Sequence, residues 1–366
     1  MHARSMAIEG RPIASDHPPF VIAELSGNHN GDIERAFRLI EAAKQVGADA
    51  IKLQTYTADT ITIDHDGPGF TITGGLWNGR RLYELYREAH TPWDWHPALF
   101  EHARKIGISC FSSPFDPTAI EFLETLDAPA YKIASFELVD TPLIRYAART
   151  GKPLILSTGM ATEQEIDEAV SCARAAGCRE LVLLKCTSNY PASPADSHLA
   201  TIPVLRSLFD CEVGLSDHTP GIGAAVASIA LGATVIEKHL TLSRADGGVD
   251  AAFSLEPNEF AQLVREAHAA AQAIGHVNFG PTESERKSLV FRRSLYITED
   301  LQAGDRLTRN NLRAIRPGYG LPPKFIDDLI GKKVRNAVRR GTPTTWELFD
   351  KSNGAEHTVA NSRQQR

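Results

Sequence analysis

The strongest constraint on the fold is an alternation of short β-branched runs with amphipathic helical runs between residues 20 and 274. This alternation is typical of parallel βαβ units, in which a helix follows each strand. The predicted strands are Phe20–Leu25, Ala50–Gln54, Ile108–Phe111, Ala130–Ala134, Pro153–Leu156, Leu181–Lys185, Glu212–Leu215 and Thr234–Glu237. The clearest predicted helices are Ile33–Val46, Glu163–Ala175, Pro220–Ala230 and Pro257–Ile274.

Eight such units in about 255 residues predict an α/β fold of the TIM (β/α)8 barrel type. A doubly wound open sheet is the structural alternative, because it is built from the same units. That fold commonly carries a glycine-rich dinucleotide loop after its first strand, and no such loop follows residue 25. We therefore expect the barrel.

The rest of the chain is arranged around this repeat. Between the second and third strands, the insertion from Thr55 to Ala98 is long enough to shape access to a barrel mouth. After the last helix the pattern changes to short strands and turns, which indicates a second, smaller domain. The predicted divisions are an N-terminal extension (1–19), the barrel (20–275), a polar linker (276–290), a small β-rich domain (291–351) and a disordered tail (352–366).

Composition and charge exclude several classes of protein. With 42% hydrophobic and 23% charged residues, the chain has a globular composition, unlike disordered or fibrous proteins. Its net charge of −6 provides no basic field for nucleic acid or an anionic membrane, so we expect neither partner. The most apolar stretch, residues 221–236, is too short and too mixed to span a bilayer.

The N-terminus and the cysteines bear on the cellular compartment. Residues 1–19 are polar and lack the apolar core of a signal peptide, and Met6 is an alternative start to Met1. The five cysteines are odd in number and have no partners at zinc-ligand spacing, so we expect reduced thiols. These features predict a cytoplasmic protein.

Polar side chains follow every predicted strand, at the end where a TIM barrel carries its active site. His218 and His239 end successive strands and are 21 residues apart, which is one βα unit. Two imidazoles in one corner of the mouth could hold a divalent metal ion and leave positions open for substrate and water. The alternative is two separate hydrogen-bonded histidines, and we favour the metal site.

Two lysines, Lys52 and Lys132, lie near the ends of the second and fourth predicted strands. Fixed cations in these positions suit a phosphate or carboxylate, which would give a negatively charged protein a local site for an anionic substrate. The alternative is a structural ion pair with Glu24 or Glu137, which are themselves candidate acid/base groups. The nearby serines that could donate further hydrogen bonds are Ser113, Ser135, Ser157 and Ser216.

Seven segments at the predicted strand ends are distinctive: Ile22–Gly31, Lys52–Tyr56, Ser112–Phe115, Tyr131–Glu137, Ser157–Met160, Gly214–His218 and Glu237–His239. Together they resemble the sialic acid synthase family. Arg293–Tyr296 and Arg316–Gly320 resemble the C-terminal SAF domain of that family, also called antifreeze-like. The resemblance covers residues 20–350 and implies a TIM barrel followed by a SAF domain.

Within the family, Gly74–Tyr86 and His90–His96 resemble the pseudaminic acid synthase branch. This resemblance implies a transferase that condenses phosphoenolpyruvate with 2,4-diacetamido-2,4,6-trideoxy-L-altrose, giving pseudaminic acid and phosphate. The alternative within the family is N-acetylneuraminate or legionaminic acid synthesis, which is the same chemistry on another hexosamine. The family also implies a homodimer whose C-terminal domains are swapped between subunits.

The resemblance assigns roles to individual residues. His218 and His239 match the ligands of a divalent metal ion, most commonly Mn²⁺ and otherwise Mg²⁺ or Co²⁺. Glu24 and Glu137 match two carboxylates near the reacting carbons, the catalytic pair. The matches to phosphoenolpyruvate contacts are Lys52, Ser113, Lys132, Ser135, Ser157, Ser188 and Ser216. The matches to sugar contacts are Gln54, Tyr190, Asp250 and Arg316, the last of which would reach the site of the partner subunit.

Two interpretations from outside this family are the competing hypotheses. A non-catalytic carbohydrate-binding protein would use the C-terminal domain and keep the barrel as a scaffold, but such a barrel should have lost part of its polar set. A class II aldolase or a keto-octulosonate phosphate synthase would share the barrel but lack the SAF domain. The polar residues that argue against a degenerate barrel are Glu24, Lys52, Lys132, His218 and His239, all present.

Overall fold

The computed structural model describes residues 6–349. The chain divides into two compact units, with the boundary between Gly275 and His276. The first unit holds the predicted barrel and the second holds the C-terminal domain. The tail that we predict to be disordered, 352–366, and the alternative start Met1 lie outside the described residues.

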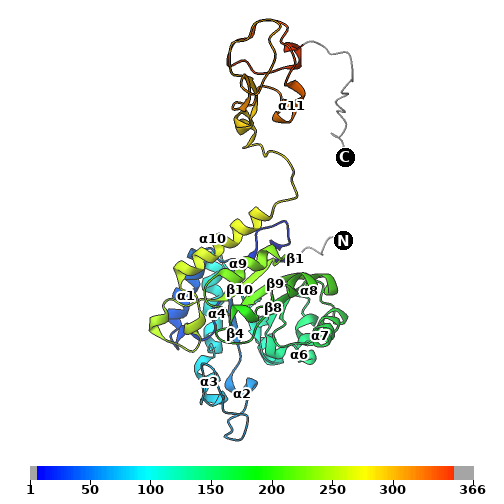
Figure 1. Cartoon of the computed structure of the whole chain (residues 1–366). Helices are drawn as coiled ribbons and strands as arrows, with labels where there is room; N and C mark the ends of the chain where they lie inside the picture. The colour runs from blue at the N-terminus through cyan, green and yellow to red at the C-terminus, as the bar shows by residue number, and fades with distance from the viewer. Residues whose placement is uncertain (1–5, 350–366) are drawn as a thin grey trace. The chain divides into compact units, whose positions relative to one another are not determined.

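The first unit is a closed barrel of eight parallel strands in the order β10-β3-β4-β5-β6-β7-β8-β9 (Figure 1). This closure confirms the TIM barrel, and the open-sheet alternative is wrong. Each predicted strand is present within a few residues of its expected bounds. The strands are β3 Phe20–Glu24, β4 Ala50–Thr55, β5 Ser109–Pro114, β6 Tyr131–Ile133, β7 Leu154–Ser157, β8 Leu181–Cys186, β9 Glu212–Asp217 and β10 Val235–His239.

The helices that follow the strands surround the barrel because they turn apolar faces to the outside of the sheet. Local signals fix their ends: Thr162 and Glu165 form a capping box at the start of α7, and Asp32 caps α1. The predicted bounds of α7 and α10 are confirmed to the residue. The helices are α1 Ile33–Gln45, α2 Ala58–Ile61, α3 Leu82–Ala89, α4 His96–Ile106, α5 Pro117–Thr125, α6 Thr141–Arg149, α7 Glu163–Ala175, α8 Thr201–Phe209, α9 Gly223–Ala230 and α10 Pro257–Ile274.

A short antiparallel hairpin, β1 Met6–Ile8 with β2 Arg11–Ile13, precedes the barrel. The sequence indicates only a polar extension here, because each strand has three residues and too little periodicity to detect. Its buried side chains Met6, Ile8 and Ile13 join one apolar cluster with residues from the amino ends of the strands, including Phe20 and Val235. The hairpin thus adds to the apolar filling at that end and leaves the polar chemistry at the other.

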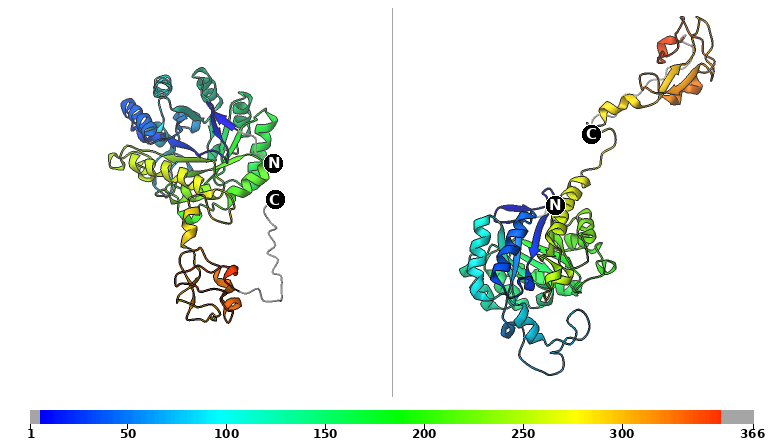
Figure 2. Two further views of the ribbon diagram at one scale, coloured as in Figure 1. Left: turned by 90° about the horizontal axis from the view of Figure 1, so that it is seen from above. Right: turned by 90° about the vertical axis from the view of Figure 1, so that its left-hand side faces the viewer.

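The insertion between β4 and β5 forms α2 and α3, which extend beyond the lower end of the barrel in Figure 1 and in the right-hand view of Figure 2. This is the end at which β4 terminates. The insertion therefore lies on the face where the carboxyl ends of the strands meet.

The second unit contains a small antiparallel sheet of β11 Ser294–Ile297 and β12 Leu312–Ile315, and the short helix α11 Ile326–Leu329. Isolated bridges such as Tyr296 with Pro343 connect its loops. A 3-10 helix, Arg286–Phe291, lies across the linker boundary that the sequence predicts. The core of this unit is small and consists of Leu295, Ile297, Leu301, Leu307, Leu312, Leu329, Val334, Val338 and Phe349.

Candidate active site

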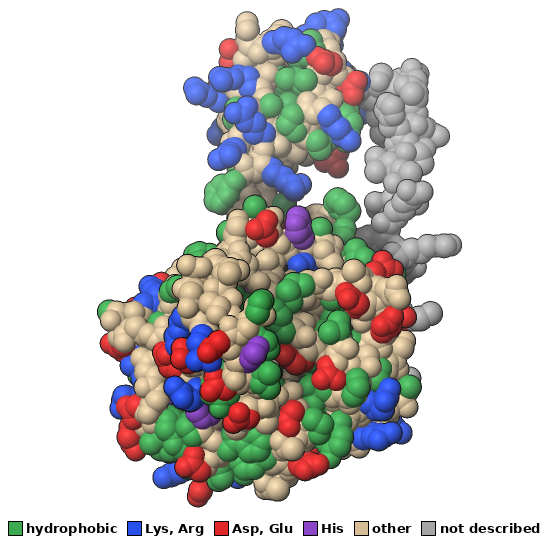
Figure 3. Space-filling view, turned by 90° about the horizontal axis from the view of Figure 1, so that it is seen from below, with side chains coloured by type: hydrophobic (Ala, Val, Ile, Leu, Met, Phe, Trp, Pro, Cys, Tyr) green, Lys and Arg blue, Asp and Glu red, His purple; other side chains and the backbone are tan. Residues whose placement is uncertain are grey.

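A cavity of about 690 Å³ lies at the carboxyl ends of the barrel strands. From that end, hydrophobic and acidic side chains both reach the surface of the barrel (Figure 3). Most of the predicted site residues line the cavity, namely Glu24, Lys52, Gln54, Lys132, Ser135, Glu137, Ser157, Ser188, Tyr190, Ser216, His218, His239 and Asp250. Two others do not: Ser113 is buried beside Lys52, and Arg316 is an exposed residue of the second unit.

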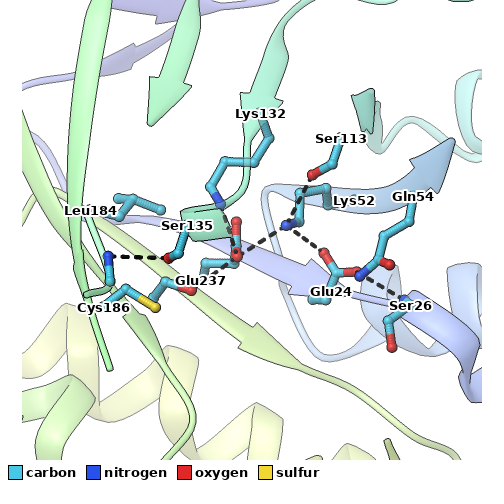
Figure 4. Close-up of polar contacts among 12 residues, drawn as sticks. Glu24, Ser26, Lys52, Gln54, Ser113, Lys132, Ser135, Leu184, Cys186 and Glu237 are labelled. Carbon is cyan, nitrogen blue, oxygen red and sulfur yellow. Dashed lines mark hydrogen bonds and ion pairs between the residues drawn. The ribbon is translucent and has the colours of Figure 1, made fainter. Parts of the chain in front are cut away.

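A buried cluster of opposite charges forms the floor of this cavity. The ammonium of Lys52 lies 2.8 Å from Oε2 of Glu24 and 3.1 Å from Oε1 of Glu237. The ammonium of Lys132 lies 3.6 Å from the same Oε1 of Glu237. Figure 4 shows Lys52 pointing between the two carboxylates and Lys132 reaching Glu237 from the other side. The predicted alternative of an ion pair between an inward lysine and Glu24 is therefore present for Lys52.

Burial and neighbouring charges shift the pKa values of the cluster's members. Burial alone would lower the pKa of Lys52, but Glu237 and Glu24 outweigh it and raise that pKa above its usual value. Burial would likewise raise the pKa of Glu237, but the charges of Lys132 and Lys52 lower it. For Lys132, burial is the larger effect and lowers the pKa despite the opposing charge of Glu237. The charged forms of Lys52 and Glu237 are thus favoured, and Lys132 lies beside the carboxylate that it shares with Lys52.

Two carboxyl groups of the cavity, those of Glu24 and Glu137, have pKa values raised to near neutral pH. Burial raises the pKa of Glu24 to about 7, against the opposing charge of Lys52. Burial raises the pKa of Glu137 to about 7 as well. Glu137 ends the 3-10 helix Ser135–Glu137 that follows β6, and within the described chain its buried Oε2 has no hydrogen-bond partner. Carboxyl groups with a pKa near 7 in a cavity are suited to accept and donate protons.

Serine hydroxyls surround the cluster. The hydroxyl of Ser216 donates to Oε1 of Glu237 over 3.1 Å, and Ser135 accepts from the backbone N–H of Gly159 over 3.1 Å. Within residues 6–349, the buried Oγ of Ser157 has no hydrogen-bond partner. A Cβ on Gly159 would come within 2.2 Å of Oγ of Ser188, so only glycine lets the loop after β7 approach these hydroxyls.

The two histidines lie together, as the strand spacing predicts, with ring centroids 5.4 Å apart. Nδ1 of His218 lies 3.0 Å from the carbonyl oxygen of Thr187, which leaves Nε2 for a ligand if Nδ1 carries the proton. Nδ1 of His239 is buried without a partner in the described part of the chain. Among residues 6–349, no group of three or more His, Cys, Asp or Glu side chains is arranged to hold a metal ion. Two imidazoles fit a divalent ion whose other ligands come from substrate and water.

Three of the predicted sugar-side residues, Gln54, Tyr190 and Asp250, line the same cavity as the cluster. The amide of Gln54 donates to Oε1 of Glu24 over 3.1 Å. The ring of Tyr190 lies 4.4 Å from that of His218, and Asp250 accepts a hydrogen bond from the hydroxyl of Ser26.

Glu237 and Cys186 are among the lining residues that the predicted set lacks. The signal for both was the alternation of side chains along a strand. Since His239 points into the barrel, Glu237, two residues earlier on β10, must point inward too. Cys186 occupies the last position of β8, and its Sγ lies 3.9 Å from Nδ1 of His218.

The architecture now defines a class of protein. A TIM barrel with this charged cavity, followed by a SAF domain, is that of the sialic acid-type synthases, which are phosphoenolpyruvate-dependent transferases that form a carbon–carbon bond and are generally metal-dependent. The NeuB family model matches residues 39–279 and the SAF domain model matches residues 292–350. The chain belongs to the NeuB family, which confirms the resemblance.

Individual relatives agree with this assignment. The pseudaminic acid synthase of Campylobacter jejuni is 46% identical, with 89% of this chain and 95% of that protein covered. The pseudaminic acid synthase of Helicobacter pylori is 42% identical, with 92% and 99% covered. The N,N'-diacetyllegionaminic acid synthase of Legionella pneumophila is 35% identical, with 93% and 97% covered.

A solved structure also resembles the chain. The N-acetylneuraminic acid synthetase of Leptospira borgpetersenii, in complex with citrate, superposes with a TM-score of 0.70 at 32% identity. The match covers 79% of this chain and 96% of that one.

None of the helices within residues 6–349 combines the length and the apolar character needed to cross a bilayer.

Proposed function

We propose that this chain is a pseudaminic acid synthase, which condenses phosphoenolpyruvate with 2,4-diacetamido-2,4,6-trideoxy-L-altrose to give pseudaminic acid and phosphate. The observation that carries the reaction is the buried Lys52–Glu237–Lys132 cluster beside two histidines in one cavity. The choice of sugar rests on identities of 42–46% to pseudaminic acid synthases, against 35% to a legionaminic acid synthase.

The proposed reaction joins C3 of phosphoenolpyruvate to the aldehyde carbon of the open-chain sugar. Bond formation leaves positive charge at C2, where a water molecule adds, and the phosphate leaves. One water is consumed and one phosphate released for each new bond. The proposed site brings both substrates together in one cavity, and water displaced on binding would strengthen the charge interactions there.

The lysines and serines of the floor are the proposed phosphoenolpyruvate contacts. Lys52 and Lys132 would bind its phosphate and carboxylate through charge-assisted hydrogen bonds. Their shared partner, Glu237, holds both ammonium groups in place before the substrate arrives. The serines proposed to add hydrogen bonds are Ser113, Ser135, Ser157, Ser188 and Ser216.

His218 and His239 are the proposed ligands of a divalent metal ion, with Mn²⁺ as our first choice. Such an ion, when bound, supplies Lewis acidity toward the sugar aldehyde. Glu24 or Glu137 would take a proton from the water that adds at C2, since both have a pKa of about 7. Gln54, together with Tyr190 and Asp250, would bind the sugar.

A panel of sugars tests the proposed substrate. The enzyme is given phosphoenolpyruvate with the trideoxy-altrose sugar, with N-acetylmannosamine or with the legionaminic acid precursor, and phosphate release is followed. We expect kcat/KM to be highest for the altrose sugar. A higher value for either other sugar would assign the chain to another branch, and release from none would contradict the reaction itself.

Removal of divalent metal is expected to abolish phosphate release, and added Mn²⁺ should restore it. His218→Ala and His239→Ala should each lose at least about 100-fold in kcat/KM with no recovery on Mn²⁺ addition, because each removes one of two protein ligands. His17→Ala, at an exposed histidine outside the cavity, is the control. Full activity in metal-free enzyme would contradict the metal site.

We further propose a homodimer in which Arg316 of one subunit reaches the sugar site of the other. The two units carry opposite charge: residues 1–275 contain 22 Lys and Arg against 35 Asp and Glu, and residues 276–366 contain 17 against 10. Opposite net charges favour association of a C-terminal unit with a barrel.

Mixing inactive subunits tests this arrangement. Arg316→Ala and Lys132→Met subunits are each expected to be nearly inactive alone when phosphoenolpyruvate is far below the raised KM of Lys132→Met. They should regain part of the activity once they exchange, because a shared site leaves each heterodimer with one intact site. Co-purification of differently tagged subunits verifies the exchange. A mixture that remains inactive after verified exchange would show that Arg316 acts in its own subunit or not at all.

A further inference from the structure

One wall of the cavity is chemically unlike the others. It comes from the insertion between β4 and β5, and we call it the insertion wall. Its side chains that line the cavity are Tyr56, Ile61, Ile72, Thr73, Leu76, Trp77, Leu82, Leu85, Tyr86 and Ala89. Of these described side chains, only those of Tyr56, Thr73, Trp77 and Tyr86 carry a polar group.

The polar group of Trp77 is already used. Its indole N–H donates to the carbonyl oxygen of Val249 over 2.9 Å, so Trp77 offers its ring and no donor to a ligand. That ring lies 5.6 Å from Tyr190, whose ring lies 4.4 Å from His218. The apolar surface therefore continues from the insertion to the two histidines.

The insertion wall is held by contacts within its own segment. The backbone N–H of Ile72 donates to the carbonyl of Arg80, and that of Gly79 donates to the carbonyl of Ile72. Arg81 pairs with Asp64, Asp66 and Glu84, which ties the loop at residues 64–66 to the start of α3. These contacts form the wall without any ligand.

The cavity also has polar lining residues from the barrel, among them Glu24, Gln54, Asn189 and Asp250. A sugar bound in this cavity would direct hydroxyl groups toward these polar residues and apolar substituents toward the insertion wall. The trideoxy-altrose sugar carries three methyl groups, one at C6 and two on its acetamido groups. N-acetylmannosamine carries one methyl group and has hydroxyls at C4 and C6. Against an apolar wall these hydroxyls would lose their hydrogen bonds to water and gain none in return, which weakens binding.

We propose that the insertion wall selects the sugar by its methyl groups, with Ile72, Leu76 and Trp77 as specificity-determining residues. This inference rests on the proposed function and names the feature by which that site tells one hexosamine from another. A methyl-sized difference in an apolar pocket changes kcat/KM by about 10- to 200-fold. Phosphoenolpyruvate, which binds to the floor, should be unaffected.

The test places polar groups on the wall. Ile72→Thr and Leu76→Asn keep approximate size and add hydrogen-bonding atoms to the cavity surface. Ile63→Thr is the matched control, since Ile63 belongs to the same insertion, is 59% exposed and does not line the cavity. For each variant, kcat/KM is measured for the trideoxy-altrose sugar, together with the KM for phosphoenolpyruvate. For N-acetylmannosamine, kcat/KM is measured if the enzyme turns it over. If it does not, the inhibition constant of N-acetylmannosamine as a competitive inhibitor is measured instead.

Relative to Ile63→Thr, each wall variant should lose about 10-fold or more in kcat/KM for the trideoxy-altrose sugar. Its preference for that sugar over N-acetylmannosamine should fall by a similar factor, with the KM for phosphoenolpyruvate unchanged. Equal losses for both sugars, or no loss, would overturn the inference while leaving the proposed function standing. A wild-type enzyme that turns over neither sugar would instead contradict the proposed function.

Discussion

Lys132→Met is expected to raise the KM for phosphoenolpyruvate by about 10- to 150-fold, the range that a hydrogen bond to a charged group supports. The ammonium of Lys132 is buried in the cavity floor and shares Glu237 with Lys52. Its removal leaves one cation where the proposed site needs two. The KM for the sugar should change much less, because the proposed sugar contacts are other residues of the cavity. Steady-state kinetics with each substrate varied in turn measure both values.

Lys185→Met is the matched control for this variant. Lys185 lies on β8 beside the cavity but does not line it, and its ammonium donates to the carbonyl of Cys186. We expect its KM for phosphoenolpyruvate to remain within a few-fold of wild type. Thermal unfolding of both variants separates a loss of binding from a loss of fold. An unchanged KM in a folded Lys132→Met enzyme would remove Lys132 from the substrate site.

Glu137→Gln is expected to lower kcat by about 10²- to 10⁴-fold, the usual contribution of a general base. A base must be ionised to act, and burial raises the pKa of Glu137 to about 7. Wild-type activity should therefore fall as the pH is lowered through about 7, because the carboxylate becomes protonated. Glutamine cannot titrate, so the variant should lose this part of the pH profile.

Two further variants interpret this result. The control is Asp140→Asn, because the charge of Asp140 contributes to the raised pKa of Glu137. The side chain of Asp140 also caps α6 through an oxygen atom, which asparagine retains. The Asp140→Asn enzyme should have a kcat within a few-fold of the wild-type value. Glu24→Gln tests the other candidate base, whose pKa is also about 7. If only Glu24→Gln lowers kcat and removes the fall of activity toward acidic pH, Glu24 is the base and Glu137 is not.

The barrel was predictable because its signals are local. Thr162 and Glu165 cap α7 within four residues, and the 18 residues of α10 show a full apolar stripe. The hairpin Met6–Ile13 was not predictable, because its strands are too short for periodicity and its buried side chains acquire a partner only when the barrel has formed.

The candidate site was predictable as a set of residues but not as a network. Strand ends converge in a TIM barrel, so the lysines and histidines could be placed together from spacing alone. The shared contact of Lys52 and Lys132 with Glu237 depends on how side chains from β4, β6 and β10 meet across the barrel. Ser113 illustrates the same limit, since it lies beside Lys52 and not on the cavity surface.

The most direct test of the central claim is to follow the fate of both substrates in one reaction. Metal-loaded enzyme is incubated with phosphoenolpyruvate and 2,4-diacetamido-2,4,6-trideoxy-L-altrose, phosphate is quantified, and the sugar product is analysed by mass spectrometry. We predict one phosphate for each product molecule, whose mass equals both substrates plus water minus phosphoric acid. Phosphate release without a joined product, or a joined product that retains the phosphate, would contradict the account.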